Sequence, residues 1–327
     1  MAKIKCTLPP AFVKRFGDVK PEGMDFEFIN YPCSDEELVE QCKDADIIFC
    51  GPVDPISGDV VKQLPNLKLI HSLGVGFDKI DLEVTKERGV YVCNNRAVNA
   101  LAVAEHAVGM MMASLKKTAY YDSKVKSDKT GYLTYKNKGG RELGARTVGL
   151  IGLGAIGHAA VKMLSSFGCK ILYTDVVRAD EAFEKEWNLT YVDHETLYKE
   201  CDILSYHVPV LDSTRGMINK ENIAKMKQDV ILVNVSRGEI VNDEDLKEAL
   251  EAGKVIAALD VVAPEPGTPE DDHILFHLNE EGNSRLTLTP HIAGTTDEAF
   301  FRMYEWSYAA MVKVMAGEKP NNVVNGL

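Results

Sequence analysis

The chain has 327 residues, of which 45% are hydrophobic and 26% are charged, a composition typical of a soluble globular protein with about two domains. Its 37 basic and 49 acidic residues leave a formal charge of −12, which argues against nucleic acid and anionic membranes as partners. The seven cysteines are scattered without a CxxC pair and no apolar leader begins the chain, so we expect reduced thiols in the cytoplasm and no metal site.

The first 99 residues alternate short apolar runs with helical patterns. The runs that predict strands are Ile4 to Leu8, Phe26 to Ile29, Ile47 to Cys50, Leu67 to His71 and Val90 to Cys93. Segments such as Asp35 to Cys42 and Asp81 to Arg88 have helical periodicity. Strands and helices that alternate at this spacing predict a small parallel α/β sheet.

A loop with two glycines, in the segment HSLGVGFDKI, follows the fourth of these runs. Gly74 and Gly76 leave a run of backbone amides free at the carboxyl end of a predicted strand, and such amides form a cradle for a carboxylate. An ordinary glycine turn explains the same residues, and this loop alone does not separate the two interpretations.

A segment rich in Ala, Met and Leu follows, from Asn99 to about Lys126. It predicts one long helix, capped by Asn99, that leads into a second domain. The polar stretch from Ser127 to Gly144 predicts a loop.

The glycine fingerprint GLGAIG stands between two apolar runs, Val148 to Ile151 and Ile171 to Thr174. This order predicts strand, tight turn, helix and strand. Gly152 permits the sharp turn, Gly154 permits a pyrophosphate to approach the backbone, and Gly157 permits close packing of helix and strand. The fingerprint therefore predicts a dinucleotide site, with a purely structural glycine turn as the alternative.

Asp175 ends the second run, 175 − 157 = 18 residues after the last glycine. An acid at this separation accepts hydrogen bonds from a ribose diol and repels a 2′-phosphate, which favours NAD over NADP. Arg178 offers a cation close by, and that cation would soften the discrimination if it faced the phosphate.

The later strands of this domain are predicted at Ile203 to His207, Val230 to Val235, Val255 to Val262 and Leu286 to Thr289, which makes six with the first two. The amphipathic segment Asp297 to Met315 predicts a helix that returns to the first domain. We therefore expect an α/β fold of two flavodoxin- or Rossmann-like parallel-sheet domains. Residues 1–99 with 296–327 would bind substrate, and residues 100–295 would form the larger, doubly wound NAD-binding domain.

Three polar residues follow predicted strands of the second sheet, where open α/β sheets bind their ligands. They are Arg237 in VNVSRGEIV, Glu265 in LDVVAPEP and His291 in TLTPHIAGTT. Singly, such residues are more often a surface cation, a loop acid and a polar cap. In this order behind a dinucleotide fingerprint, they are much more specific for catalysis.

The chain resembles the D-isomer-specific 2-hydroxyacid dehydrogenases over nearly its whole length. The matching segments are GVGFDKID, NALAVAE, GLGAIG, HVPVLDSTRGMI, VNVSRGEIV, LDVVAPEP and TPHIAGTT. The resemblance implies that Arg237 binds the substrate carboxylate and polarises its carbonyl, that His291 is the acid/base, and that Glu265 is its partner. It also implies that the amides of Val75 and Gly76 bind the carboxylate.

The resemblance further implies NAD as cofactor, a small 2-hydroxy or 2-keto acid as substrate, and a homodimer with the helix from Asn99 at its interface. The implied cofactor-binding residues are Gly152, Gly154, Ala155, Ile156, Gly157, Asp175, Pro209, Thr214 and Asp260. Ala155 stands where many relatives have arginine, so one side-chain contact to the pyrophosphate is not expected.

These features predict an NAD-dependent enzyme that interconverts a D-2-hydroxy acid and a 2-keto acid. A carboxylate beside His291 favours the protonated imidazole, which is ready to donate a proton. An NAD(H)-sensing, corepressor-like binding protein is the alternative.

Phosphoglycerate-oxidising members of the family tend to carry arginines where this chain has Gly51 to Val53 and Ser72. By this resemblance, 3-phosphoglycerate is a less expected substrate. Arg96 either recognises a second acidic group or is simply solvated.

Overall fold

The computed structural model describes residues 2–16, 21, 24–128, 130–136, 139–268 and 270–327. These residues form two compact units, 1–99 with 295–327 and 100–294. The roles in substrate and cofactor binding that the sequence suggests for the two units stay predictions.

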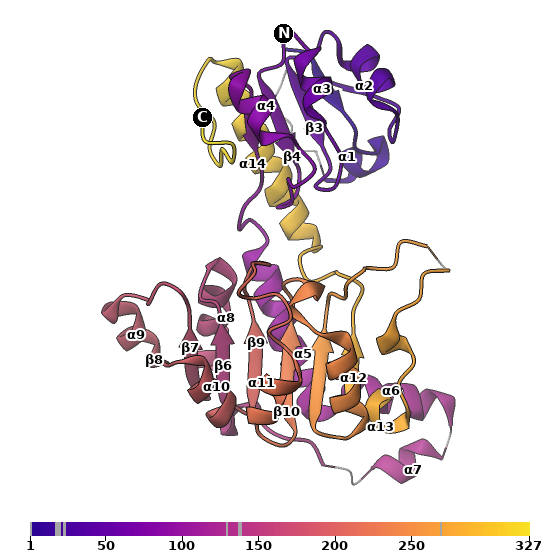
Figure 1. The fold of residues 1–327 in the computed structure, drawn as a ribbon, viewed down its shortest axis with the longest axis vertical. Coiled ribbons are helices and arrows are strands. Elements are labelled where there is room, and N and C mark those ends of the chain that lie inside the picture. The colour runs from indigo at the N-terminus through magenta and orange to yellow at the C-terminus, as the bar shows by residue number, and fades with distance from the viewer. Residues whose placement is uncertain (1, 17–20, 22–23, 129, 137–138, 269) are drawn as a thin grey trace. The chain divides into compact units, whose positions relative to one another are not determined.

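The first unit is built on a five-stranded sheet in the order β2-β1-β3-β4-β5, with all neighbours parallel (Figure 1). Its strands are β1 (Ile4–Cys6), β2 (Phe26–Phe28), β3 (Ile47–Cys50), β4 (Leu69–Ser72) and β5 (Tyr91–Cys93). Its helices are α1 (Pro10–Phe16), α2 (Asp35–Cys42), α3 (Gly58–Lys62), α4 (Leu82–Glu87) and α14 (Asp297–Met315). The parallel sheet expected from the alternating pattern is therefore confirmed.

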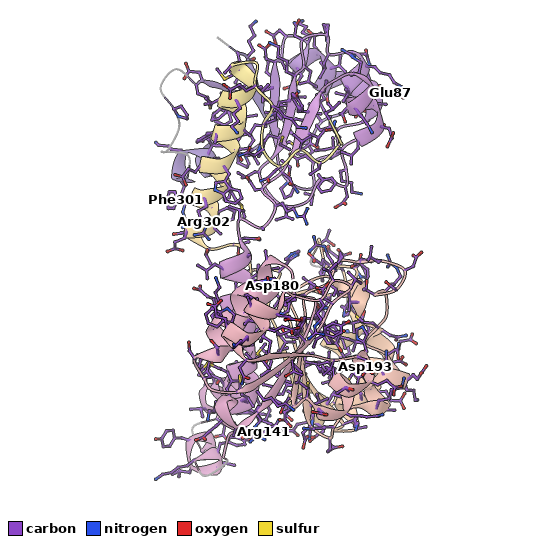
Figure 2. The ribbon with its side chains drawn as sticks, turned by 90° about the vertical axis from the view of Figure 1, so that its left-hand side faces the viewer. Glu87, Arg141, Asp180, Asp193, Phe301 and Arg302 are labelled. Carbon is purple, nitrogen blue, oxygen red and sulfur yellow. The ribbon has the colours of Figure 1, made fainter. Side chains whose placement is uncertain are left out.

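Helix α14 belongs to the first unit although it comes last in the chain. Tyr304 and Tyr308 on this helix are fully buried and pack around Phe49 of β3. The guanidinium of Arg302, labelled in Figure 2, donates to the carbonyl of Val98 at 3.2 Å. The aromatic packing and this hydrogen bond hold α14 to parts of the first unit that precede it by more than two hundred positions in the chain.

The second unit is built on a seven-stranded parallel sheet in the order β12-β11-β10-β9-β6-β7-β8. Its strands are β6 (Thr147–Ile151), β7 (Lys170–Thr174), β8 (Leu189–Tyr191), β9 (Ile203–Tyr206), β10 (Val230–Asn234), β11 (Val255–Leu259) and β12 (Leu286–Leu288). The strand order reverses between β6 and β9. Ligands of open α/β sheets bind at such a switch point.

Helices cover both faces of this sheet, as expected of a doubly wound fold (Figure 1). They are α5 (Ala100–Lys116), α6 (Thr118–Ser127), α7 (Gly131–Tyr135), α8 (Ala155–Ser165), α9 (Glu181–Trp187), α10 (His194–Glu200), α11 (Lys220–Lys225), α12 (Asp243–Glu251) and α13 (Glu280–Asn283), with short 3-10 turns η1 (Leu143–Ala145), η2 (Gly238–Ile240) and η3 (Ile274–Phe276). Alternate strand residues point to opposite faces, so the core has two parts. One lies under α5 and α8, the other under α10, α11 and α12.

Three expectations about this unit are wrong. The helix predicted from Asn99 to Lys126 is broken at Lys117, whose φ of 52° ends α5 and starts α6. The stretch from Ser127 to Gly144 contains α7 and the start of η1, although residues 129 and 137–138 lie outside the described residues. The sheet has seven strands because β8 adds to the six that were predicted. Across the described residues, no helix is long and apolar enough to cross a membrane.

Candidate active site

The glycine loop after β6 has the geometry that a dinucleotide phosphate needs. Gly152 has a φ of +94°, and a Cβ there would lie 2.6 Å from the carbonyl oxygen of His207, so only glycine fits. A Cβ on Gly157 would lie 2.6 Å from the carbonyl oxygen of Gly152, which explains the close approach of α8 to the strand. A Cβ on Gly154 would meet nothing within 4 Å, and the exposed Ala155 begins α8. The first amides of α8, which include that of Ile156, are therefore open to an anionic group.

Asp175 is held at the end of β7 beside this loop. Its Oδ2 accepts from the amide of Leu153 at 2.5 Å, and its Oδ1 accepts from the amide of Val177 at 3.1 Å. A carboxylate oxygen has more than one acceptor site, so both oxygens can still accept from a ribose diol. The residues present at this site therefore fit an adenosine ribose.

Pro209 and Thr214, the other two cofactor candidates after a strand, lie in one turn that follows β9. The hydroxyl of Thr214 donates to the carbonyl of Pro209 at 2.6 Å and accepts from the amide of Leu211 at 2.8 Å. These bonds use the hydroxyl inside the turn. The structure thus gives Thr214 a role in shaping the turn, and its contact to the cofactor stays a prediction.

His291 and Glu265 lie within hydrogen-bond distance of each other, as the family resemblance implies. Imidazole Nδ1 lies 2.7 Å from Glu265 Oε1, and the two side chains are 48% and 47% exposed. Both line a pocket of about 360 Å³ within the second unit, together with Val262, Phe276 and Leu288. Because Nδ1 faces the carboxylate, Nε2 is the ring nitrogen left to exchange a proton with a ligand.

Asp260 holds the backbone around His291. This carboxylate is 1% exposed and accepts from the amides of Ile292 at 3.0 Å and Ala293 at 2.9 Å, while the Asp260 carbonyl accepts from the His291 amide at 2.8 Å. His291 itself has a φ of 53°, an unfavourable value for a residue with a Cβ. Asp260 therefore keeps His291 in a strained conformation. The contact expected between Asp260 and the nicotinamide stays a prediction.

A side chain from α5 extends this network. The Thr289 hydroxyl donates to Asp260 Oδ1 at 2.5 Å, and His106 Nε2 lies 3.0 Å from the same hydroxyl. A hydroxyl has one proton, so Thr289 must accept from His106, whose Nε2 then carries the hydrogen. Helix α5 thereby fixes the loop that carries His291.

Arg237 stands at the start of η2 with its side chain exposed, and its Nη1 donates to the carbonyl of Ser236 at 2.8 Å. A Cβ on the next residue, Gly238, would overlap the backbone of Val262 and Ala263. This glycine lets the Arg237 loop lie directly against the chain that leads to Glu265. Among the described residues, Arg237 makes no hydrogen bond or ion pair with Glu265 or His291.

The two-glycine loop of the first unit has its carbonyl groups tied down. The carbonyls of Gly74, Val75 and Gly76 accept, in that order, from the Asn95 amide at 2.9 Å, the Asn94 side-chain amide at 2.6 Å and the Ser72 hydroxyl at 2.7 Å. All three donor residues are buried. The loop also packs tightly against Pro52. A Cβ on Gly76 would lie only 2.8 Å from the Pro52 carbonyl oxygen, so a larger residue would not fit there.

The N–H of each peptide points opposite to its carbonyl, so the amides of Val75, Gly76 and Phe77 face away from these donors. None of the three has a hydrogen-bond acceptor within the described part of the chain. The loop therefore presents a row of free amides, the arrangement that binds a carboxylate.

Two other histidines close to predicted site residues are unsuited to proton transfer at neutral pH. Burial lowers the pKa of His71, in β4, to about 4, and it lowers the pKa of His207, after β9, to about 4 as well. Each is therefore neutral at pH 7. His71 lies in β4, within the run that predicted this strand, and its Nδ1 has no hydrogen-bond partner among the described residues.

Sequence reasoning missed the residues that support the site, which are Ser72, Asn94, His106, Gly238 and Thr289. A glycine directly after Arg237 was a signal that the backbone passes close to another chain segment. The bond from His106 to Thr289 joins residues 183 positions apart, and no local pattern signals such a contact.

Comparisons with known proteins agree with this geometry. A family model described as "D-isomer specific 2-hydroxyacid dehydrogenase, NAD binding domain" matches residues 108–293. The chain is 38% identical over 303 residues to a glyoxylate reductase from Thermofilum pendens, covering 90% of this chain and 86% of that protein. It is 38% identical over 265 residues to a hydroxypyruvate reductase from Thermotoga maritima, covering 81% and 83%.

Among solved structures, the chain is similar to D-lactate dehydrogenase with NAD+ from Lactobacillus jensenii. The identity is 30%, the TM-score is 0.83, and the match covers 98% of this chain and 99% of that one. The chain is an NAD-dependent oxidoreductase, and the corepressor-like alternative is not favoured. It belongs to the D-isomer-specific 2-hydroxyacid dehydrogenase family.

Proposed function

We propose that this chain reduces a small 2-keto acid to the D-2-hydroxy acid with NADH, and that His291 supplies the proton. The observation that carries the proposal is the 2.7 Å pair of His291 and Glu265, half-exposed in a pocket of the unit that holds the glycine fingerprint. A buried pair would not reach a ligand. A half-exposed imidazole beside a carboxylate is a suitable acid/base.

In the proposed reaction, NADH supplies a hydride to the carbonyl carbon. His291 Nε2–H donates its proton to the carbonyl oxygen, so the keto acid gains one hydride and one proton in total. Glu265, 2.7 Å from Nδ1, accepts a hydrogen bond from this nitrogen and orients the ring for the transfer. Arg237 offers a planar, permanently charged fork that pairs with the substrate carboxylate and stabilises the negative charge that develops on the oxygen.

The free amides of Val75 and Gly76 are proposed as further ligands of the substrate carboxylate. Their support is that both N–H groups are unpaired among the described residues and that the carbonyls of the same two peptides are held by the Asn95 backbone amide and the Asn94 side chain. Pro209, Thr214, Asp175, Asp260 and the residues of the glycine fingerprint are proposed to contact the dinucleotide.

Glyoxylate and hydroxypyruvate are the substrates we propose first, because relatives at 38% identity are named as their reductases. Ser72 offers no group to a phosphorylated substrate, since it is buried and its hydroxyl donates to the Gly76 carbonyl. A relative at 35% identity is named D-3-phosphoglycerate dehydrogenase, and this chain spans 53% of that protein. Phosphohydroxypyruvate therefore belongs in the test.

The experiment is NADH consumption with glyoxylate, pyruvate, hydroxypyruvate, its phosphate, 2-oxoglutarate, and branched or aromatic keto acids. We expect turnover of a small keto acid that is abolished in His291→Ala and in Arg237→Ala, while both variants still bind NADH. No turnover of any substrate by a wild-type protein that binds NADH tightly would instead support the sensor function.

We also propose that the chain is a cytoplasmic homodimer that pairs through α5. The support is that Leu101 and Met112 on this helix are 49% and 42% exposed, and that all seven cysteines are free. Sedimentation equilibrium of wild type and Met112→Glu tests the dimer. We expect twice the chain mass for the wild type and a shift toward the monomer for the variant.

A further inference from the structure

Arg178, the cation three residues after Asp175, is held in an ion pair. Its Nε and Nη2 each donate to Glu184 at 2.8 Å, to Oε1 and Oε2 respectively. This is the two-pronged geometry in which arginine binds a carboxylate most strongly. Two of the five guanidinium N–H groups are thereby used, and the charge of Arg178 is neutralised by Glu184.

The Glu184 carboxylate also accepts a hydrogen bond from a second residue, Tyr173. The hydroxyl of Tyr173, near the end of β7, donates to Glu184 Oε1 at 2.6 Å and accepts from the amide of Ala179 at 2.9 Å. The Glu184 side chain is only 11% exposed. Hydrogen bonds from Arg178 and Tyr173 lower its pKa to about 2, so the carboxylate stays charged at physiological pH.

The N-terminal cap of α9 and the ring of Tyr191 also hold this ion pair in place. Asp180, labelled in Figure 2, caps α9 by accepting from the amide of Phe183 at 2.8 Å, which places Glu184 in the first turn of the helix. The Arg178 guanidinium lies over the ring of Tyr191, 5.5 Å from its centre, and the Tyr191 hydroxyl donates to the carbonyl of Asp175 at 3.3 Å. The ion pair is therefore next to Asp175 and restrained on two sides.

We propose that Glu184 makes this chain selective for NAD by withholding Arg178 from the ribose 2′ position. A 2′-phosphate would then meet the carboxylate of Asp175 with no free cation to compensate it. Without Glu184, the same arginine would be a phosphate ligand beside the ribose. The inference rests on the proposed contact between Asp175 and the adenosine ribose.

The test measures the dissociation constants of NADH and NADPH for the full chain by calorimetric titration, without turnover. We expect Glu184→Gln to bind NADPH about tenfold more tightly than the wild type, the effect of gaining one charge-assisted hydrogen bond, while NADH changes less than twofold. Adding Arg178→Gln to this variant should abolish the gain.

Glu186→Gln is the matched control, because it removes the same charge from the same helix at an exposed position away from Arg178. The proposal is overturned if Glu184→Gln leaves NADPH affinity unchanged, if Glu186→Gln produces the same gain, or if the gain survives in the double variant. Should Glu184→Gln lose NADH binding altogether, Tyr173→Phe provides the second test, with an expected threefold gain for NADPH. No gain in Tyr173→Phe then overturns the proposal.

Asp175→Ser tests the proposed contact between Asp175 and the adenosine ribose separately from the role of Glu184. An unchanged ratio of NADPH to NADH affinity in Asp175→Ser contradicts the ribose contact of Asp175. The result for Glu184→Gln in the wild-type background still decides whether Arg178 is withheld.

Discussion

A backbone amide binds a carboxylate well only when its peptide plane is held in one orientation. In the first unit, the buried side chains of Ser72 and Asn94 hold the carbonyls of Gly76 and Val75, and the N–H groups of these peptides face the other way. The substrate affinity of the loop should therefore depend on side chains that do not touch the substrate.

We expect Ser72→Ala to raise the KM for the keto acid about three- to tenfold, because the peptide between Gly76 and Phe77, next to the proposed carboxylate ligands in the row of free amides, loses the hydrogen bond that orients it. The dissociation constant for NADH should not change. Steady-state kinetics and NADH titration measure the two quantities. Ser114→Ala is the matched control, since Ser114 is also buried and its hydroxyl has no partner among the described residues. An unchanged KM in Ser72→Ala, or an equal rise in Ser114→Ala, contradicts this role.

At the scale of single elements, close backbone contact brings the chain segments that carry proposed site residues next to each other. The turn η2 follows Arg237 and lies against the Val262–Ala263 peptide. This peptide is so close to Gly238 that no side chain would fit there. We expect Gly238→Ala to lower kcat/KM at least a hundredfold, because the loop must move away and Arg237 moves with it. Thermal melting and NADH titration would show whether the rest of the unit is still folded.

Gly267→Ala is the control for this substitution. Gly267 follows Glu265 closely in the chain, but a Cβ there would meet only Asp271, at an ordinary 3.7 Å. Its kcat/KM should stay within about twofold of the wild type. If both glycine variants lose activity equally, tight packing at Gly238 is not the cause.

The elements themselves were predictable where the pattern is local. Helices α2 and α14 begin and end at the predicted residues, since each has a capping residue and a periodic apolar face. The break at Lys117 was not predictable, because a lysine with positive φ gives no sequence signal. Strand β8 was missed because its three residues include two exposed ones and show no apolar run.

The candidate site was also predictable where its residues follow a local sequence pattern. His291 and Glu265 follow apolar runs and carry ionisable groups, so sequence and resemblance identified them together. The resemblance predicted the buried Asp260 as a site residue, but its bonds to the amides of Ile292 and Ala293 depend on how β11 and the loop after β12 meet. The strain at His291 is likewise a product of tertiary structure.

At the scale of the whole molecule, each unit contains a histidine that burial keeps neutral. His71 lies in the first unit and His207 in the second, and both pKa values are lowered from 6.5 to about 4. Below pH 6.5 the unfolded chain takes up protons at these positions, while the folded chain does so only near pH 4. The free energy of unfolding should therefore fall as the pH drops through this window.

Urea unfolding at pH 7 and pH 4.5 measures this effect. We expect each histidine to account for a loss of up to about 3 kcal/mol between these conditions. His71→Met should be less sensitive to acid than the wild type, because it has no imidazole to protonate. Equal losses in the two proteins would show that His71 does not titrate in this range.

The pairing of Glu265 with His291 is central to the proposed reaction, and a double-mutant cycle in kcat/KM for keto-acid reduction tests it most directly. Glu265 lies 2.7 Å from Nδ1 of His291 and would act on the substrate only through this ring, so its effect should disappear when the imidazole is absent. We expect Glu265→Gln to lower kcat/KM about a hundredfold with NADH affinity unchanged, and to lower the residual activity of His291→Asn no further. Equal losses from Glu265→Gln in the wild type and in His291→Asn would contradict the assignment of His291 and Glu265 as the acid/base pair.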